Sequence, residues 1–194
     1  MRTRLCLLWL LACAALLTAC GGGGIQPGID DQRRWQLSGK LGLRAPNLAE
    51  SAYLNWRQCG DRYSIRLSGP LGQTAARIEG RGEQLTVWID NREPVTTADP
   101  ERLLQEQLGW SIPLRALRYW VRAEAAPGGG ARLEGPAGRP TGLHQFGWEL
   151  SYLEYHHNNE LALPAKLILR DPQLRATLLI RDWLLGDAVK DCQA

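Results

Sequence analysis

Cys20 is the residue whose surroundings most clearly indicate covalent chemistry. It follows Leu17, Thr18 and Ala19 at the end of an apolar run, and a stretch of glycines comes directly after it. The sequence starts with two arginines near its N-terminus, followed by an almost wholly apolar segment at residues 5–16 and by small residues. These are features of a secretion signal, in which small residues precede the cleavage site. A cysteine in this place offers its sulfur and, after cleavage, its amino group for acylation.

Residues 17–20 are similar to the bacterial lipobox, in which the cysteine sulfur carries a diacylglycerol and the new amino group is acylated after cleavage. We therefore expect residues 1–19 to be a lipoprotein signal peptide, and Cys20 with these N-acyl and S-diacylglycerol lipids to begin the mature protein. Two alternatives stay open. One is a spanning helix, which needs about 20 apolar residues, more than precede the glycines. The other is an ordinary signal in which Cys20 has no role.

The residues after the cut have the composition of a linker. Residues 20–30 are rich in glycine with one proline, so we expect the acylated cysteine to continue into a flexible tether. Gly21, rather than aspartate, follows the cysteine. By analogy with bacterial sorting rules, this favours export to the outer membrane.

The rest of the sequence offers little support for catalysis. It contains no nucleophile elbow, zinc-protease helix, phosphate-binding loop or dinucleotide fingerprint. His156 and His157 are adjacent, so on a strand they point to opposite faces and do not hold one metal together. Glu149 and Glu154 are expected to be surface charges, because alternation places charges outside. We therefore expect no enzyme activity, no catalytic residue, no metal and no cofactor.

Two cysteines outside the signal and lipobox could pair with each other. Cys59 lies in a turn-like segment, and Cys192 lies near the end of the sequence. An oxidising periplasm permits a disulfide, but the sequence does not fix the distance between the two residues. The pairing therefore stays open, and the spacing is unlike that of a zinc site.

Composition limits the partners of the mature chain. The sequence has 23 Lys and Arg against 20 Asp and Glu, and two of the cations lie in the signal. Without a basic surplus we expect no binding to nucleic acid. Eight Trp and five Tyr contrast with one Phe. Such side chains suit an interface or a roomy apolar pocket, although most of them can also be ordinary core.

Alternation of apolar and polar residues predicts strands on either side of a helical insert. The first strands are expected at residues 35–44, 52–56, 63–68, 76–78 and 85–89, and the later ones at 145–150, 152–156, 166–170 and 174–183. Asp99 and Pro100 are typical of a helix start, Gly109 of its end, and a second helix is expected near Pro113. Residues 126–142 read as a loop around at most a short strand at 132–134. We expect eight to ten strands with the helices lying on the sheet.

These elements form a single mainly β (α+β) domain, which we place at residues 31–186, with a C-terminal tail at 187–194. One turn in the domain is unusual. Gly69 and Gly72 bracket Pro70 and Leu71, which predicts a tight turn with an apolar residue near its tip. Because turns usually lie at the surface, we expect Leu71 to be exposed. The alternative is that the tip folds back and buries it.

Several segments together resemble the LolB family of outer-membrane lipoproteins. In order, they are Trp35-x-Leu37-x-Gly39-Lys40-Leu41, Leu54-x-Trp56, Tyr63-x-Ile65-x-Leu67-Ser68-Gly69-Pro70-Leu71-Gly72-Gln73, Leu108-Gly109-Trp110-x-Ile112-Pro113, Gly147-Trp148 and Leu163-Pro164. The resemblance runs from the lipobox to about Trp183. It departs in the glycine-rich residues 126–142, which look longer and looser than the family pattern.

The resemblance implies a half-open antiparallel β-barrel whose mouth is covered by helices that enclose an apolar cavity. It implies a lipid-anchored protein on the periplasmic side of the outer membrane, which receives acylated lipoproteins from the soluble carrier LolA and inserts them into that membrane. It also implies that the turn of Gly69, Pro70, Leu71 and Gly72 projects from the barrel and that Leu71 helps pass cargo into the bilayer. We expect a monomer.

Alternation gives one apolar face for the acyl chains, without saying which residues line a cavity and which fill a solid core. We expect the concave face to include some of Trp35, Leu37, Leu54, Trp56, Ile65, Leu67, Phe146, Trp148 and Leu178, covered by Leu117 and Trp120.

Two other functions fit the same fold, because fold alone does not determine function. One is a lipoprotein of the envelope that binds lipid or glycolipid without delivering lipoproteins. The other is a structural envelope lipoprotein whose barrel is filled by its own side chains. Transfer of a lipoprotein from LolA separates these three functions.

Overall fold

The structure is a computed structural model, and it describes residues 33–82, 84–89, 92–109, 111–156 and 161–192. The expected signal peptide, Cys20 and the tether lie outside the described residues. So do His157 and Trp110.

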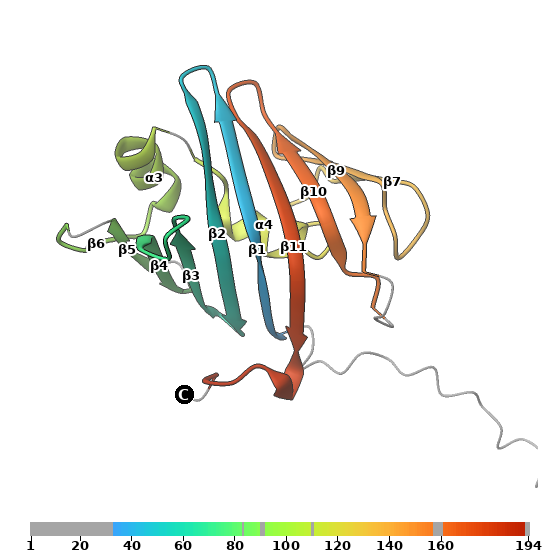
Figure 1. Ribbon diagram of the computed structural model, residues 1–194. Helices are drawn as coiled ribbons and strands as arrows, with labels where there is room; N and C mark the ends of the chain where they lie inside the picture. The colour runs from blue at the N-terminus through green and yellow to red at the C-terminus, as the bar shows by residue number, and fades with distance from the viewer. Residues whose placement is uncertain (1–32, 83, 90–91, 110, 157–160, 193–194) are drawn as a thin grey trace, which may run out of the picture.

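One antiparallel sheet organises the chain. Its eleven strands lie in the order β6-β5-β4-β3-β2-β1-β11-β10-β9-β8-β7, so the first and last strands are neighbours in the middle (Figure 1). The strands are β1 (Arg34–Ala45), β2 (Leu48–Cys59), β3 (Arg62–Ser68), β4 (Thr74–Arg81), β5 (Gln84–Ile89), β6 (Val95–Thr97), β7 (Arg132–Glu134), β8 (Gly142–Gln145), β9 (Trp148–Tyr155), β10 (Pro164–Arg170) and β11 (Arg175–Leu185).

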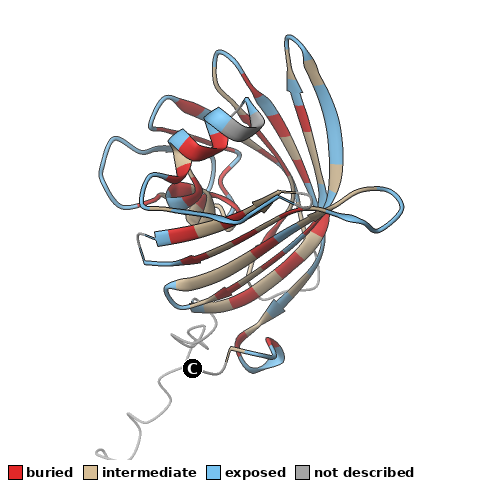
Figure 2. Ribbon diagram, turned by 90° about the vertical axis from the view of Figure 1, so that its left-hand side faces the viewer, coloured by how far each residue is buried: buried red, intermediate tan, exposed pale blue. Residues whose placement is uncertain are grey.

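The sheet curves around one apolar face, and two helices cover its open side. Buried residues alternate with exposed ones along the strands, as Figure 2 shows. The helices α3 (Pro100–Leu108) and α4 (Leu114–Trp120) lie between β6 and β7 in the chain. The expected half-open barrel with a helical cover is confirmed. None of the helices among the described residues is long and apolar enough to cross a membrane.

The start and end of α3 follow the expected chemistry. The Asp99 carboxylate accepts a hydrogen bond from the Arg102 backbone N–H at 3.2 Å, which satisfies one donor of the first turn. Gly109 adopts the left-handed conformation at the other end, with a φ of 73°. The helix therefore has a well-defined length and presents Leu103 and Leu104 to the sheet, where both are buried.

The pairing of β1 with β11 depends on Gly39. The register shifts between Ser38 and Gly39, and a Cβ atom on Gly39 would lie 2.0 Å from the Leu179 carbonyl oxygen. The strands can therefore approach each other only with glycine at this position. This contact joins the two ends of the chain at the centre of the sheet.

The predicted strand pattern is wrong in one region. Residues 145–150 do not form one strand, because Phe146 and Gly147 make a two-residue turn between β8 and β9. Both residues have positive φ, 53° and 79°, as the commonest tight hairpins require. Asn-Gly or Asp-Gly usually signals such a turn, and a phenylalanine with positive φ is rare. The strands expected at 145–150 and 152–156 are instead β8 and β9, with the boundary between them moved to this turn. The additional strand is β6, which had no sequence signal and brings the sheet to eleven strands instead of eight to ten.

Three tryptophans fill the closed end of the barrel. The Trp35 ring lies 5.1 Å from that of Trp56 and 5.6 Å from that of Trp183. Trp35 and Trp56 are buried, and Trp183 is half-buried. The three rings therefore pack against one another at this end of the sheet, where Trp35 also borders an open cleft.

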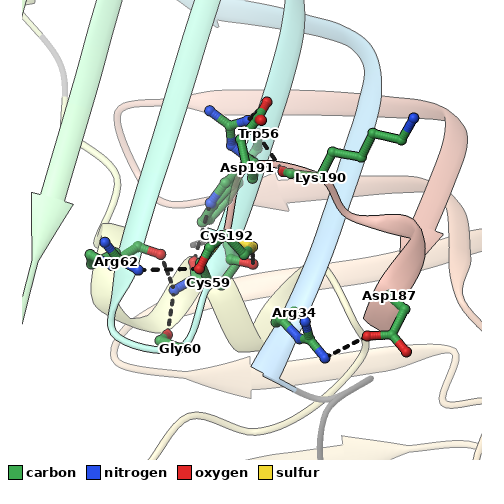
Figure 3. The surroundings of a disulfide bond; sticks show 11 residues. Arg34, Trp56, Cys59, Gly60, Arg62, Asp187, Lys190, Asp191 and Cys192 are labelled. Carbon is green, nitrogen blue, oxygen red and sulfur yellow. Dashed lines mark hydrogen bonds and ion pairs between the residues drawn. A yellow bond between two sulfur atoms is a disulfide. The ribbon is translucent and has the colours of Figure 1, made fainter. Parts of the chain in front are cut away.

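The chain after β11 lies against the closed end. Cys59 and Cys192 form a disulfide with a Cα–Cα distance of 5.4 Å, which answers the question left open by the sequence (Figure 3). Asp187 pairs with Arg34 at 2.8 Å, and Asp191 pairs with Arg57 at 3.2 Å. Residues 187–192 thus form a strap across the ends of β1, β2 and β3.

Breaking this disulfide should lower the free energy of unfolding by about 2–5 kcal/mol, because a cross-link that closes a long loop restricts the unfolded chain. The two cysteines are 133 residues apart. Urea unfolding of residues 20–194 with and without a reductant measures the effect. In the double variant Cys59→Ser/Cys192→Ser the midpoint should equal that of the reduced wild type and should not respond to reductant. An unchanged wild-type midpoint on reduction would contradict the prediction.

Candidate functional site

An apolar cavity of about 50 Å³ lies between the concave face of the sheet and the two helices. Every residue that lines it is apolar. Leu104 of α3 and Leu114 and Leu117 of α4 form its roof, with Ile112 between the helices. The walls come from β1 to β4 and from β10 and β11.

The structure places six of the eleven residues expected at the cavity on its wall or roof. They are Leu54, Trp56, Ile65, Leu67, Leu117 and Leu178. Sequence analysis did not name Leu41, Ile78, Leu169 and Ala176, which also line it. All four lie within expected strands, and Leu41 belongs to the same alternating face as Leu37. The sequence therefore indicated which face of the sheet these residues lie on, but not which residues of that face line the cavity.

The other five expected residues lie elsewhere on the concave side. Trp35 and Leu37 are buried and belong to the core, Trp35 at the closed end. Trp120 lies between Trp148 and Phe146, with ring centroids 6.3 and 6.4 Å away. Phe146 is 51% exposed, so this residue is at the rim and not on the cavity wall.

A second, open cleft of about 790 Å³ lies at the mouth of the barrel. It is bordered by the hairpin tips at residues 45–46 and 171–174, by the rim residues Phe146 and Trp148, and by the two helices. Arg115, Ala116 and Tyr119 of α4 line the cleft, whereas Leu114 and Leu117 line the closed cavity. One short helix therefore separates the apolar cavity from the open cleft.

The two ends of α4 are held very differently. At its C-terminal end, Trp120 Nε1 donates a hydrogen bond to Gln145 Oε1 at 2.9 Å, and the Tyr152 hydroxyl donates to the Trp120 carbonyl oxygen at 2.9 Å. At the N-terminal end, Pro113 provides no side-chain cap. The Arg115 side chain at this end donates a hydrogen bond to the Ala98 carbonyl oxygen at 3.4 Å. The helix is thus fixed to β8 and β9 by buried hydrogen bonds at one end, and held at the other by apolar contacts and an exposed hydrogen bond.

Gln145 is a positioning residue that sequence analysis missed. Its side chain is buried, donates to the Ala126 carbonyl oxygen at 2.7 Å and accepts from the Ala126 N–H at 2.9 Å. With the bond from Trp120, both ends of the amide are satisfied. Because the turn after Gln145 was not recognised, alternation did not indicate that this side chain points inward.

Burial controls the titration of groups around α4. It raises the pKa of Tyr152 far above the usual value and also raises that of Tyr63, so both phenols are neutral donors at neutral pH. Burial also raises the pKa of the Glu124 carboxyl, an effect that the charge of Arg122 partly offsets. The two groups form an ion pair at 2.9 Å.

The turn between β3 and β4 projects from the sheet (Figure 2). The Gly69 N–H donates to the Gln73 carbonyl oxygen at 2.9 Å, and the Gly72 N–H donates to the Gly69 carbonyl oxygen at 3.0 Å. Gly72 has a φ of 83°, which favours glycine. Leu71 at the tip is 94% exposed, as expected from the sequence.

The residues considered for catalysis or metal binding have structural partners. His156 Nε2 lies 3.1 Å from the Ile180 carbonyl oxygen, and Glu154 pairs with Lys166 at 3.3 Å. Glu149 is exposed, 4.0 Å from Arg170. Among the described residues, no group of three or more His, Cys, Asp or Glu could hold a metal ion.

Comparison with solved structures shows the fold at low sequence identity. A LolA superfamily protein from Nitrosomonas europaea aligns with a TM-score of 0.52 and 14% identity, over 80% of this chain and 87% of that one. A DUF1329 family protein from Desulfovibrio piger aligns with a TM-score of 0.58 and 6% identity, over 84% and 89%. Both alignments extend over most of this chain, so they show that the overall fold is shared.

Comparison of sequences identifies the family. The family model described as "Outer membrane lipoprotein LolB" matches residues 33–183. The outer-membrane lipoprotein LolB of Pseudomonas fluorescens is 38% identical over 88% of this chain and 91% of its own length. The LolB of Cellvibrio japonicus is 38% identical over 94% and 97%. With the closed apolar cavity, its helical roof and these matches along most of its length, the chain belongs to the LolB family of outer-membrane lipoproteins.

Proposed function

We propose that this protein accepts acylated lipoproteins from a LolA-like periplasmic carrier and inserts them into the outer membrane, as a lipid-anchored monomer facing the periplasm. The observation that supports this most is the position of α4. The helix has an apolar cavity on one side and a wide open cleft on the other. A cargo can arrive in the cleft and reach the cavity when this one helix moves.

The energetics of acyl chains require such an enclosure. Each methylene group transferred from water to an apolar site contributes about 0.8 kcal/mol, so a cargo with several long chains would lose tens of kcal/mol in water. The lining of the cavity is wholly apolar and suits such chains. Transfer then runs downhill, from the carrier to this cavity and from the cavity to the bilayer.

The cavity must open before it can take an acyl chain. Its volume of about 50 Å³ is too small for several long acyl chains. The N-terminal end of α4, which has no side-chain cap, is the element that swings out once the exposed hydrogen bond of Arg115 to Ala98 breaks, with the hydrogen bonds of Trp120 as its pivot. Leu114 and Leu117 then become part of the wall against the bound chains.

Leu71 is the proposed point of entry into the bilayer. Its side chain extends into solvent at the tip of a turn made rigid by two backbone hydrogen bonds. Burying one leucine in lipid contributes about 1.5–3 kcal/mol. This is too little to anchor the protein, but it is enough to favour insertion of the turn at the moment of delivery.

Transfer of a radiolabelled lipoprotein from purified LolA tests the function. Residues 20–194 with Cys20→Ala should take the lipoprotein from the carrier. Leu117→Glu should reduce this uptake at least tenfold, because a carboxylate in the roof of an apolar chamber is costly to bury. Gln84→Glu places the same group at an exposed strand position and should have no effect.

The possible failures of this experiment have different meanings. Binding of a fluorescent fatty acid without uptake of lipoprotein would favour a protein that only binds lipid. Failure to bind either ligand would favour a filled structural barrel. Equal uptake by Leu117→Glu and Gln84→Glu would show that the cavity does not take part in uptake.

Leu71→Glu should leave uptake from the carrier and the unfolding midpoint unchanged, and slow delivery into liposomes about tenfold or more. Delivery is measured as radiolabel that floats with the vesicles. Leu133→Glu is the matched control, because Leu133 is also exposed, on the edge strand β7. If uptake and stability fall together with delivery, Leu71 is a packing residue and its proposed role is wrong.

Cys20→Ser should leave the precursor uncut, with residues 1–19 attached, because processing of a lipobox requires acylation of the cysteine. Mass spectrometry of the membrane fraction gives the length and the lipid content. Cys59→Ser/Cys192→Ser retains Cys20 and should be processed normally. A Cys20→Ser protein that is cut and released without lipid would contradict the proposed anchor.

A further inference from the structure

The outer, convex face of the sheet carries a group of cationic and aromatic residues beside the Leu71 turn. We call Lys40, Tyr53, Arg66, Arg77 and Trp88 the hairpin patch. They lie on five consecutive strands, β1 to β5. Successive side chains of a strand point to opposite faces of the sheet. The strand neighbours of the patch residues are buried or half-buried, as with Leu54, Ile65, Ile78 and Val87, so the patch residues themselves point away from the core.

Register makes the patch contiguous. Lys40 pairs with Tyr53, and Tyr53 with Ser68, the last residue before the turn. Arg66 lies two residues before Ser68 on β3, which is the next position on the same face. It pairs with Arg77, which in turn pairs with Trp88. Neighbouring strands are about 4.8 Å apart, so the whole patch lies within two rows of the base of the turn.

The positive charges of the hairpin patch repel one another when no ligand is bound. Arg66 and Arg77 lie directly opposite each other, and like charges in this position destabilise a sheet. Arg77 has a carboxylate partner, Glu79, at 3.1 Å. Within the part of the chain that the structure describes, no carboxylate pairs with Lys40 or Arg66. Since cations and anions are nearly balanced over the whole sequence, this concentration is local.

The aromatic rings hold the cations at the surface. Lys40 Nζ lies 4.9 Å from the centre of the Tyr53 ring, and Arg77 Cζ lies 4.3 Å from that of Trp88. Tyr53 is 41% exposed. Tyrosine and tryptophan beside basic residues suit the boundary between water and acyl chains, where the rings lie among the headgroups.

We propose that the hairpin patch is a docking surface for the anionic phospholipid headgroups of a bilayer. Headgroup phosphates supply the negative charge that Lys40 and Arg66 lack, while Leu71 enters the acyl region beside them. The proposal rests on the proposed function only for this contact of Leu71 with lipid. The proposal adds the orientation of the domain on the bilayer. The chain between Cys20 and Arg33 spans at most about 45 Å. An anchor at Cys20 therefore holds the domain near the bilayer but does not select the face that meets it.

Vesicle binding tests the patch. Residues 20–194 with Cys20→Ala are mixed with vesicles of phosphatidylcholine alone or of phosphatidylcholine with phosphatidylglycerol, and bound protein is measured by flotation. The protein should bind the anionic vesicles more tightly. High salt should abolish the difference, because the Debye length falls to about 3 Å at 1 M.

Lys40→Gln/Arg66→Gln should weaken binding to the anionic vesicles about ten- to thirtyfold, since each basic residue near such a surface contributes about tenfold or less. Arg102→Gln/Arg132→Gln is the control of equal charge. Both control side chains are 71% exposed, on α3 and β7, away from the patch. Neither double variant should have a lower unfolding midpoint than the wild type, and the patch variant gains stability because Arg66 no longer faces Arg77.

Three results would overturn the proposal. The wild type could bind both kinds of vesicle equally, the patch variant could bind as the wild type does, or the control could lose as much affinity as the patch variant. A patch variant that loses uptake from LolA but keeps its vesicle binding would also overturn it, because the patch would then serve a protein partner.

The same measurements separate this proposal from the proposed function. Leu71→Gln, which removes the apolar side chain without adding charge, should weaken binding to both kinds of vesicle and keep the preference for phosphatidylglycerol. Uptake of lipoprotein from LolA is measured without vesicles, so its failure in the wild type would reject the proposed function while the headgroup preference stands. Normal uptake without any headgroup preference would reject only the hairpin patch.

Discussion

The structure depends on covering the concave face of an open sheet. A half-closed sheet of this kind exposes a broad apolar surface to water unless another element lies on it. Among the described residues, the two short helices α3 and α4 cover this face, and their leucines meet those of the strands around the small cavity. The pairing of β1 with β11 through Gly39 gives the sheet its curvature at the centre, and the disulfide strap fixes the closed end. Opening is therefore restricted to the helical side.

The C-terminal end of α4 stabilises the helix on the sheet, and its N-terminal end is the one proposed to move when the cavity opens. Gln145 and Tyr152 hold the C-terminal end of α4 with buried hydrogen bonds, which are costly to break because the freed polar groups stay buried. The N-terminal end has apolar contacts, which an acyl chain can replace with contacts of the same kind, and an exposed hydrogen bond from Arg115 to Ala98, which water can replace. A lipid that enters beneath Leu114 and Leu117 therefore substitutes for the roof that it displaces, and the cost of moving the helix is partly offset by the ligand itself.

Sequence predicted the features that depend on local chemistry. Alternation identified most strands, Asp99 and Gly109 identified the ends of α3, and the glycines around Leu71 identified an exposed turn. It missed features that depend on distant residues. The positive φ of Phe146 has no local signal, and without that turn the inward direction of Gln145 could not be foreseen. For the same reason alternation placed Trp35 and Phe146 with the cavity residues: it gives the face of a residue, but not its height along the barrel or its distance from the helices.

The two faces of the sheet are coupled by the alternation of strand residues. Ile65 lines the cavity and Arg66 faces outward, and Tyr53 and Leu54 divide in the same way. A shift of one residue in the register of β3 would send arginine into the cavity and isoleucine to the surface. The register must therefore be fixed up to Leu67 and yet release the chain into a projecting turn directly afterwards. The irregularity between Leu67 and Ser68 in the pairing of β3 with β4 does this, because it confines the change of direction to the residues that follow the last one lining the cavity.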